Sequence, residues 1–178
     1  MTKPKLLGIS GSLRTNATNT LLLREAARLF GAAEYTQADI RFPLFDADEQ
    51  AAKGVPEAVV KVARQIEAAD AVIISTPEYN KGPSGVIKNA LDWISRVDFK
   101  PWNDKPVAVM SAAAGRAGGE RAQMVLRGFM VPFRPRILQG PEIHLAGSGD
   151  QFDEAGRLKG EIYVRELTDL MQALHRMI

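Results

Sequence analysis

The feature that most constrains the fold is a succession of three local patterns between residues 71 and 94. Ala71–Ser75 is an apolar run of strand length, as expected of a strand covered on both faces. The next stretch, Thr76–Ser84, holds two prolines and a glycine, which neither a strand nor a helix tolerates well. From Gly85 the apolar residues recur at helical spacing, and Ser84 is a suitable N-cap. The chain therefore predicts a buried strand that opens into a stiff loop and then a helix.

This loop carries more functional side chains than a simple connection requires. Glu78, Tyr79 and Asn80 follow Pro77 at the predicted carboxyl end of the strand. In open α/β sheets, ligands bind at that end of the strands. A planar ring can stack on Tyr79, and its polar edge can meet Asn80 or backbone amides. The structural alternative is a tight loop whose polar residues are simply exposed.

A second loop with similar character follows the first predicted strand, Lys5–Ser10. It carries Arg14 and leads into a helix predicted over Leu21–Phe30. Free amides at a helix start, the helix dipole and nearby hydroxyls together form an anion site, which predicts binding of a phosphate monoester. The side chains able to donate to a phosphate are Ser10, Ser12, Thr15, Asn16, Thr18, Asn19 and Thr20. The alternative is that one of the last three only caps the helix.

Several other site types are excluded by the sequence. The loop after the first predicted strand contains neither the Gly-Lys-Ser/Thr of a Walker A loop nor the Gly-x-Gly-x-x-Gly of a dinucleotide fingerprint. The absence of cysteine excludes disulfides, thiolate nucleophiles and cysteine-based metal sites. Only His144 and His175 are available, so we expect no metal centre. The net charge of +2 suits an anionic ligand, but the scattered basic residues argue against nucleic-acid binding.

The length of 178 residues suits a single domain over residues 1–178. No apolar run approaches the roughly 20 residues that a membrane-spanning helix requires. Residues 1–4 lead directly into the first predicted strand, without the apolar region of a signal peptide. We therefore expect a cytoplasmic protein with no membrane partner.

Strand and helix patterns alternate along the rest of the chain. Further strands are expected at Glu34–Ile40, Pro106–Ala113, Arg134–Leu138 and Glu142–Ala146, and further helices at Pro56–Ala69, Glu120–Met130 and from Ile162 to Met177. This alternation predicts a parallel sheet with helices on both faces. Because the two loops richest in polar side chains follow the first and third predicted strands, we expect a flavodoxin-like α/β sandwich. Its five strands would have the order 2-1-3-4-5, with the ligand at the switch point.

The helix that follows Ser84 has two apolar stripes. The first consists of Ile87, Leu91 and Ile94, and the second of Val86, Ala90, Trp93 and Val97. One stripe should face the sheet, and the other would be exposed unless a second subunit covers it. We therefore expect a homodimer or homotetramer formed through the helix that carries Trp93. The alternative is that a neighbouring loop of the same chain buries this stripe.

The two loops resemble those of the NADPH-dependent FMN reductase family, in particular its quinone-, azo- and chromate-reducing members. Pro77-Glu78-Tyr79-Asn80 matches the family's Pro-Glu-Tyr-Asn, and Ile87–Trp93 matches its Leu-Lys-Asn-Ala-(Ile/Leu)-Asp-Trp. Between them, Pro83 comes one residue earlier than the family's usual proline. Gly11, Ser12, Arg14 and Asn19 fall on the family's Gly-Ser-x-Arg-x-x-Ser-x-Asn, with Ala17 in place of its serine. The resemblance extends from Leu6 to about Phe129.

The resemblance implies a site for FMN. The first loop would hold the phosphate, with Arg14 beside it, and the glycine-rich loop after Ser111 would lie against the flavin. Arg116 in that loop would face the flavin or the nicotinamide cofactor, or else be a solvated side chain. The cofactor-binding residues expected on this basis are Ser10, Ser12, Arg14, Ala17, Thr18, Asn19, Thr20, Pro77, Glu78, Tyr79, Asn80, Ser111, Gly115 and Arg116.

The activity implied is an FMN-dependent NAD(P)H oxidoreductase. NADPH or NADH would reduce the flavin, and a small acceptor would then take the electrons: a quinone, an azo compound, a free flavin or a metal oxyanion such as chromate. The flavin carries this chemistry, so no catalytic side chain is expected. One alternative is a flavodoxin-type electron carrier, although such carriers are usually strongly acidic and this chain is not. Another is a binding module that has lost the flavin, to which only Ala17 points.

Overall fold

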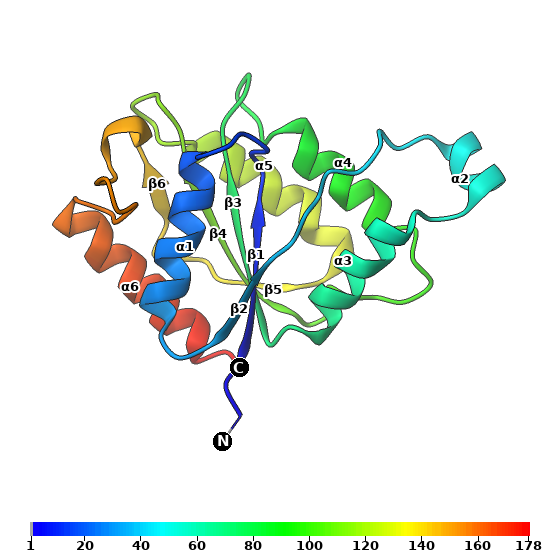
Figure 1. Ribbon diagram of the computed structural model, residues 1–178, viewed down its shortest axis with the longest axis horizontal. Coiled ribbons are helices and arrows are strands. Elements are labelled where there is room, and N and C mark those ends of the chain that lie inside the picture. Colours follow the sequence, from blue (N-terminus) through cyan, green and yellow to red (C-terminus); the bar gives the residue numbers. More distant parts are fainter. Residues whose placement is uncertain (1) are drawn as a thin grey trace.

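A parallel sheet forms the centre of the computed structural model, which describes residues 2–178 (Figure 1). Its strands are β1 (Lys5–Ser10), β2 (Glu34–Gln37), β3 (Ala71–Thr76), β4 (Pro106–Ala112), β5 (Arg136–Ile137) and β6 (Ile143–Leu145). The strand order is β2-β1-β3-β4-β5, and every pairing is parallel. The predicted flavodoxin-like order is confirmed. The fifth position is split, since β5 pairs with the beginning of β4 and β6 pairs with its end.

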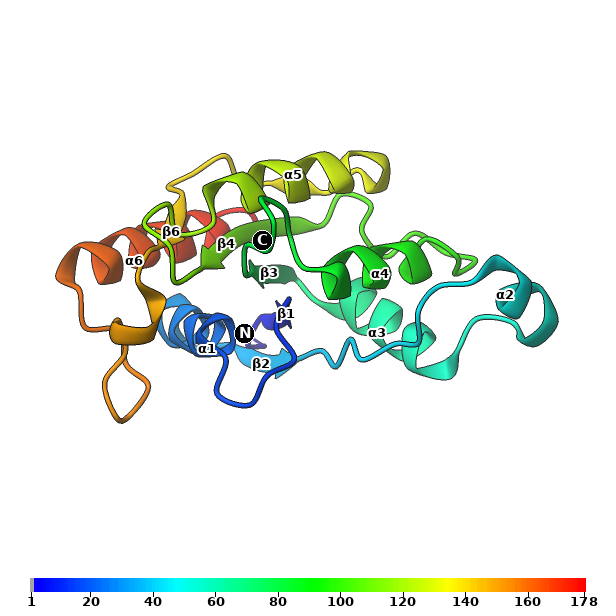
Figure 2. The ribbon, with the colours of Figure 1, turned by 90° about the horizontal axis from the view of Figure 1, so that it is seen from above.

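Helices cover both faces of the sheet, as the alternating pattern predicts (Figure 2). They are α1 (Thr18–Phe30), α2 (Ala47–Lys53), α3 (Glu57–Ala68), α4 (Gly85–Ile94), α5 (Glu120–Met130) and α6 (Glu161–His175). Helices α1 and α6 share one hydrophobic core with the sheet, whereas α3, α4 and α5 share the other. In β3, Val72 and Ile74 belong to the second core, and Ala71 and Ile73 to the first. This strand is therefore buried on both sides, as its apolar run requires.

Helix α2 was not predicted because its sequence lacks the apolar spacing of a packed helix. None of its residues is buried. The helix is instead started by Asp46, whose Oδ1 accepts hydrogen bonds from the amides of Asp48 (2.8 Å) and Glu49 (3.3 Å). Capping of this kind stabilises a short exposed helix without any contribution from the core. No helix within residues 2–178 is long and apolar enough to cross a bilayer.

The expectation of an exposed apolar stripe at Trp93 is wrong. Its side chain is only 2% exposed, because residues 41–46 of the same chain lie over it. The indole Nε1 donates to the carbonyl of Pro43 (2.8 Å), and the ring meets Phe45 edge-on at 5.0 Å. Asn89 holds the same segment by accepting from the Phe45 amide (2.8 Å) and donating to the Pro43 carbonyl (2.9 Å). The reason for placing a subunit contact at this stripe therefore disappears.

A buried carboxylate connects α1 to the segment before α6. The Glu25 side chain is 2% exposed and accepts hydrogen bonds from Arg28 (3.0 Å), Arg157 (3.0 Å) and the amide of Leu158 (3.4 Å). Burial acts to raise the pKa of Glu25, but these hydrogen bonds outweigh it and the pKa is lowered. The ionised carboxylate is therefore part of what fixes this segment to α1.

We expect Glu25→Gln to lower the free energy of unfolding by about 2 kcal/mol at neutral pH, because the three charge-assisted hydrogen bonds from Arg28 and Arg157 are weakened. The Glu25 contribution is complete above its ordinary pKa of 4.5 and is lost as the pH falls through the lowered folded-state pKa. Urea unfolding between pH 3 and 7 should therefore depend less on pH in the variant than in the parent. Equal pH slopes would contradict the assignment. Glu154→Gln, at an exposed carboxylate nearby that accepts no hydrogen bond within residues 2–178, serves as the control; Asp153 is unsuitable because it accepts from the Arg157 amide.

Candidate functional site

One large open cleft lies at the carboxyl edge of the sheet, the edge that Figure 2 views from above. Its volume is about 1340 Å³, and the loops after β1, β3, β4 and β6 surround it. The predicted site residues that line it are Ser12, Arg14, Thr18, Asn19, Pro77, Glu78, Tyr79, Gly115 and Arg116. Those that do not are Ser10, Ala17, Thr20, Asn80 and Ser111. The cleft thus brings together three segments that are far apart in the sequence.

The beginning of α1 presents free hydrogen-bond donors to the cleft. The helix starts earlier than predicted, with Ala17 as N-cap and no side-chain cap. The alternative reading of Thr18, Asn19 or Thr20 as the N-cap is therefore wrong. Within residues 2–178, the amides of Thr18 and Asn19 have no hydrogen-bond acceptor. Such a helix start attracts an anion.

Two hydroxyls of the first loop stabilise the loop itself. Thr20 Oγ1 donates to Ser10 Oγ (3.1 Å), and Ser10 Oγ donates to the carbonyl of Ser12 (3.1 Å). The Ser12 amide in turn donates to Ser10 Oγ (3.2 Å). Thr18 behaves differently, because its Oγ1 lies at the cleft, 3.1 Å from Ser148 Oγ.

Asn19 joins the first turn of α1 to two strands. Its side chain is 2% exposed, and Oδ1 accepts from Ser75 Oγ (2.7 Å) and from the Ala112 amide (3.1 Å). Its Nδ2 donates to the Ala112 carbonyl (2.9 Å). The hydrogen bonds of this side chain are thus made within the protein. Only the backbone amide of Asn19 is left to bind a ligand.

The loop after β3 contains a two-residue turn. The amide of Tyr79 donates to the Gly82 carbonyl (2.9 Å), and the amide of Gly82 donates to the Tyr79 carbonyl (3.1 Å). Asn80 (φ 50°) and Lys81 (φ 67°) both adopt the left-handed conformation, as a type I′ turn requires. Asparagine tolerates this conformation better than most residues, which explains Asn80 in structural terms. The turn leaves Tyr79 53% exposed at the cleft.

Glu78 connects this loop to α5. Its Oε2 accepts from the Ala122 amide (3.2 Å), in the first turn of a helix whose N-cap, Gly119, supplies no side chain. A carboxylate in this position satisfies a free amide and interacts favourably with the helix dipole. Glu78 therefore sets the relative position of two loops that line the cleft.

We expect Glu78→Ala to lower the free energy of unfolding by about 1 kcal/mol, the usual effect of losing a helix cap. Glu78→Gln keeps an acceptor oxygen and should lose less than half of that amount. The measurement is urea unfolding of the parent and both variants. Equal losses in both variants would mean that the hydrogen bond to Ala122 contributes nothing.

The side chain of Ser111 fixes the glycine-rich loop that follows β4. Ser111 is fully buried, and its Oγ donates to the Gly118 carbonyl (2.7 Å) and accepts from Gln123 Nε2 (2.9 Å). Gly115 and Arg116 are exposed at the cleft, and a methyl group on Gly115 would meet no atom within 4 Å. Ser111 therefore fixes the loop, while Gly115 and Arg116 form its open side.

The structure adds residues to the cleft that sequence patterns did not indicate. They include Lys81, Arg121, Ser148 and Phe152, together with backbone of the loop after β4, whereas Asn16, which also lines the cleft, belongs to the predicted phosphate loop. Ser148 and Phe152 follow β6, in a segment with no recognisable motif. The only available signal was its richness in glycine and polar residues.

The charges at the cleft favour an anionic ligand. Arg14, Arg116 and Arg121 all line it, and none forms an ion pair within the described part of the chain. Of the two lining carboxylates, Glu78 is engaged at α5, which leaves Glu120. An aromatic side chain, free helix amides and unpaired arginines are the groups that a phosphorylated planar ring requires.

Comparisons with known proteins indicate the family of the chain. Residues 4–148 match the sequence model of the NADPH-dependent FMN reductase family. An NAD(P)H-dependent FMN reductase of Pseudomonas aeruginosa is 41% identical over 172 residues, covering 96% of this chain and 92% of that protein. A quinone reductase of Escherichia coli K12 is 37% identical over 145 residues, covering 79% and 76%. The NAD(P)H:acceptor oxidoreductase FerB of Paracoccus denitrificans superposes with a TM-score of 0.87 at 28% identity, covering 98% and 96%.

Proposed function

Because the chain belongs to the NADPH-dependent FMN reductase family, we propose that FMN binds in the cleft with its phosphate at the beginning of α1. The chain is an FMN-dependent NAD(P)H oxidoreductase that reduces a small acceptor. Bound FMN supplies the electron-transfer chemistry, and the protein binds and orients it. Single-domain organisation over residues 1–178 and a cytoplasmic location belong to the same proposal.

The observation that carries the site assignment is the pair of free amides at Thr18 and Asn19. They lie at the cleft, which Arg14 also lines, and nothing in residues 2–178 accepts their hydrogen bonds. A phosphate would take both bonds and interact favourably with the helix dipole. Tyr79, Gly115 and Arg116 surround the remaining space and are proposed to contact the ring and the nicotinamide cofactor.

The acceptor proposed is a quinone, with azo compounds, free flavins and chromate as further candidates. The relative named as a quinone reductase supports the first of these. The cleft is wide enough for FMN and a second planar molecule, at about 1340 Å³. Steady-state rates with a quinone, an azo dye, FMN and chromate as acceptors, at matched NADPH, would rank them.

The test of this proposal is the visible spectrum of the purified protein, before and after anaerobic NADPH. We expect a flavin spectrum that bleaches promptly. A bound flavin that stays oxidised would instead indicate an electron carrier. Failure of the protein to bind added FMN would overturn the placement of the phosphate.

We expect Arg14→Ala to weaken FMN or NAD(P)H binding about tenfold, the effect of one lost charge-assisted hydrogen bond. Arg14 is exposed and forms no ion pair among the described residues, so folding should not change. Titrations of the apoprotein with FMN and of the FMN-loaded protein with NADPH measure the two affinities. Arg165→Ala, at an exposed arginine of α6 that does not line the cleft, is the matched control. Unchanged affinity for both ligands would remove Arg14 from the site.

A homodimer or homotetramer is also proposed, but through a different surface from the one that carries Trp93. Met124 and Val131 are 65% and 71% exposed on the outer side of α5 and just after it. Exposed apolar side chains at this spacing favour a helix contact. Sedimentation velocity of the parent and of Met124→Lys would test whether they lie in an interface.

A further inference from the structure

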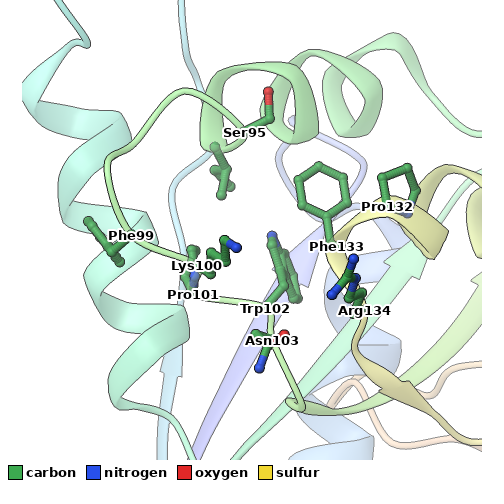
Figure 3. A pocket seen from close by; sticks show the side chains of 10 residues that line it. Ser95, Phe99, Lys100, Pro101, Trp102, Asn103, Pro132, Phe133 and Arg134 are labelled. Atoms are coloured by element: carbon green, nitrogen blue, oxygen red, sulfur yellow. The ribbon is translucent and has the colours of Figure 1, made fainter.

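A second cavity, separate from the cleft, has the properties of a ligand site. It has a volume of about 290 Å³ and lies between the end of α4, the turn at Phe99–Asn103 and the segment Pro132–Arg134 (Figure 3). None of its lining residues lines the cleft, and the turn leads into the amino end of β4. We propose that this cavity binds a small aromatic carboxylate.

The walls of the cavity suit a flat apolar ring. Phe99, Trp102 and Phe133 contribute aromatic side chains, and Pro101 and Pro132 add rigid apolar surface. Figure 3 shows Trp102 and Phe133 bordering a common space, with Phe99 at its edge beside α3. Phe99 is held from outside by the Arg64 guanidinium, which lies 3.7 Å from the ring centre. Aromatic walls of this kind bind another ring by stacking and edge contacts.

A buried hydrogen-bond donor at the cavity has no partner. Trp102 is 1% exposed, and its indole Nε1 makes no hydrogen bond within residues 2–178. Figure 3 shows this nitrogen turned toward the space enclosed by the labelled side chains. Trp93 differs, since its Nε1 donates to the Pro43 carbonyl. Buried donors are nearly always paired, so an unpaired one at a cavity points to a missing acceptor.

The charges around the cavity indicate which kind of acceptor would bind Trp102 Nε1. Lys100 and Arg134 are exposed at the cavity, and neither forms an ion pair in the described part of the chain. No lining residue is acidic. A carboxylate would interact with both cations, and one of its oxygens would accept from Trp102 Nε1 after a small displacement of the cavity wall that covers this nitrogen.

The volume limits the ligand to a single ring. A cavity of 290 Å³ is at the lower end of the range for small-molecule sites. A benzoate-sized anion fits these limits, whereas a nucleotide or a flavin does not. The cavity is therefore not a second copy of the cofactor site.

The test uses the fact that the chain has only two tryptophans. In a Trp93→Phe variant loaded with FMN, tryptophan emission reports on Trp102 alone. Titration with sodium benzoate should give a saturable change in emission. Benzamide, which has the same shape without the charge, should bind about tenfold or more weakly.

The matched control is the same variant carrying Lys100→Gln and Arg134→Gln. Both positions are exposed, so folding should be retained, which circular dichroism checks. Benzoate affinity should fall by about tenfold or more in this background. Binding of benzoate in the flavin cleft would leave the response unchanged by these substitutions. Three results would overturn the proposal: a response unchanged by these substitutions, equal responses to benzoate and benzamide, or no saturable change in emission.

Discussion

Replacing Asn19 by alanine is expected to lower the free energy of unfolding by about 3 kcal/mol. The side chain is buried, and the substitution leaves the hydroxyl of Ser75 and both backbone polar groups of Ala112 without their partner. Each buried polar group left unsatisfied costs about 1 kcal/mol or more. Since α1 is joined to β3 and β4 through this amide, FMN affinity should also fall.

Urea unfolding of the apoprotein measures the loss in stability, and FMN titration measures the loss in affinity. Asn103→Ala is the matched control, because Asn103 is exposed and its side chain makes no hydrogen bond within residues 2–178. It should change stability by less than about 0.5 kcal/mol. If Asn19→Ala were as mild as this control, the connection between helix and strands would contribute nothing to stability.

Most of the fold could be predicted because its signals are local or periodic. The apolar run at Ala71–Ser75 lies within β3, and Ser84 is the N-cap of α4, with Oγ accepting from the Ile87 amide (3.5 Å). Helix α5 has the predicted bounds, Glu120–Met130. The strand order could be predicted because the two loops richest in polar side chains follow the first and third strands. In a parallel α/β sheet, ligands bind at the switch point of the strand order.

The direction of individual side chains could not be predicted. Ser111 lies at the end of β4 and Asn19 at the start of α1, both beside the cleft, yet each turns its side chain into the protein. The acceptor and donor groups of Asn19 meet Ala112, 93 residues away in the sequence. Motif spacing identifies the loop that approaches a ligand, but only tertiary packing decides which side chains point toward it.

Contacts between distant segments explain the remaining differences. The sequence pattern showed that Trp93 lies on an apolar stripe, but residues 41–46 have no regular period that would predict their packing over it. Ser148 meets Thr18 across 130 residues. Ser148 is part of no local pattern at its own position, so its contact with Thr18 could not be inferred.

Replacing Gly118 by alanine is expected to lower the free energy of unfolding by more than about 3 kcal/mol. Gly118 has φ +58°, a left-handed conformation that costs alanine about 1 kcal/mol or more. An added methyl group would also overlap the carbonyl group of His144 and lie 3.0 Å from the Ala146 amide nitrogen. Because these contacts are backbone atoms of β6 and the residue after it, the clash cannot be relieved by rotating a side chain.

Gly115→Ala is the matched control in the same loop. Its methyl group would meet no atom within 4 Å, so stability should change by less than about 0.5 kcal/mol. Urea unfolding distinguishes the two variants, and FMN titration should show weaker binding in Gly118→Ala, since the loop can no longer lie against β6. Equal stability of the two variants would mean that the loop moves away from β6 at little cost, and that Ser111 does not hold it in place.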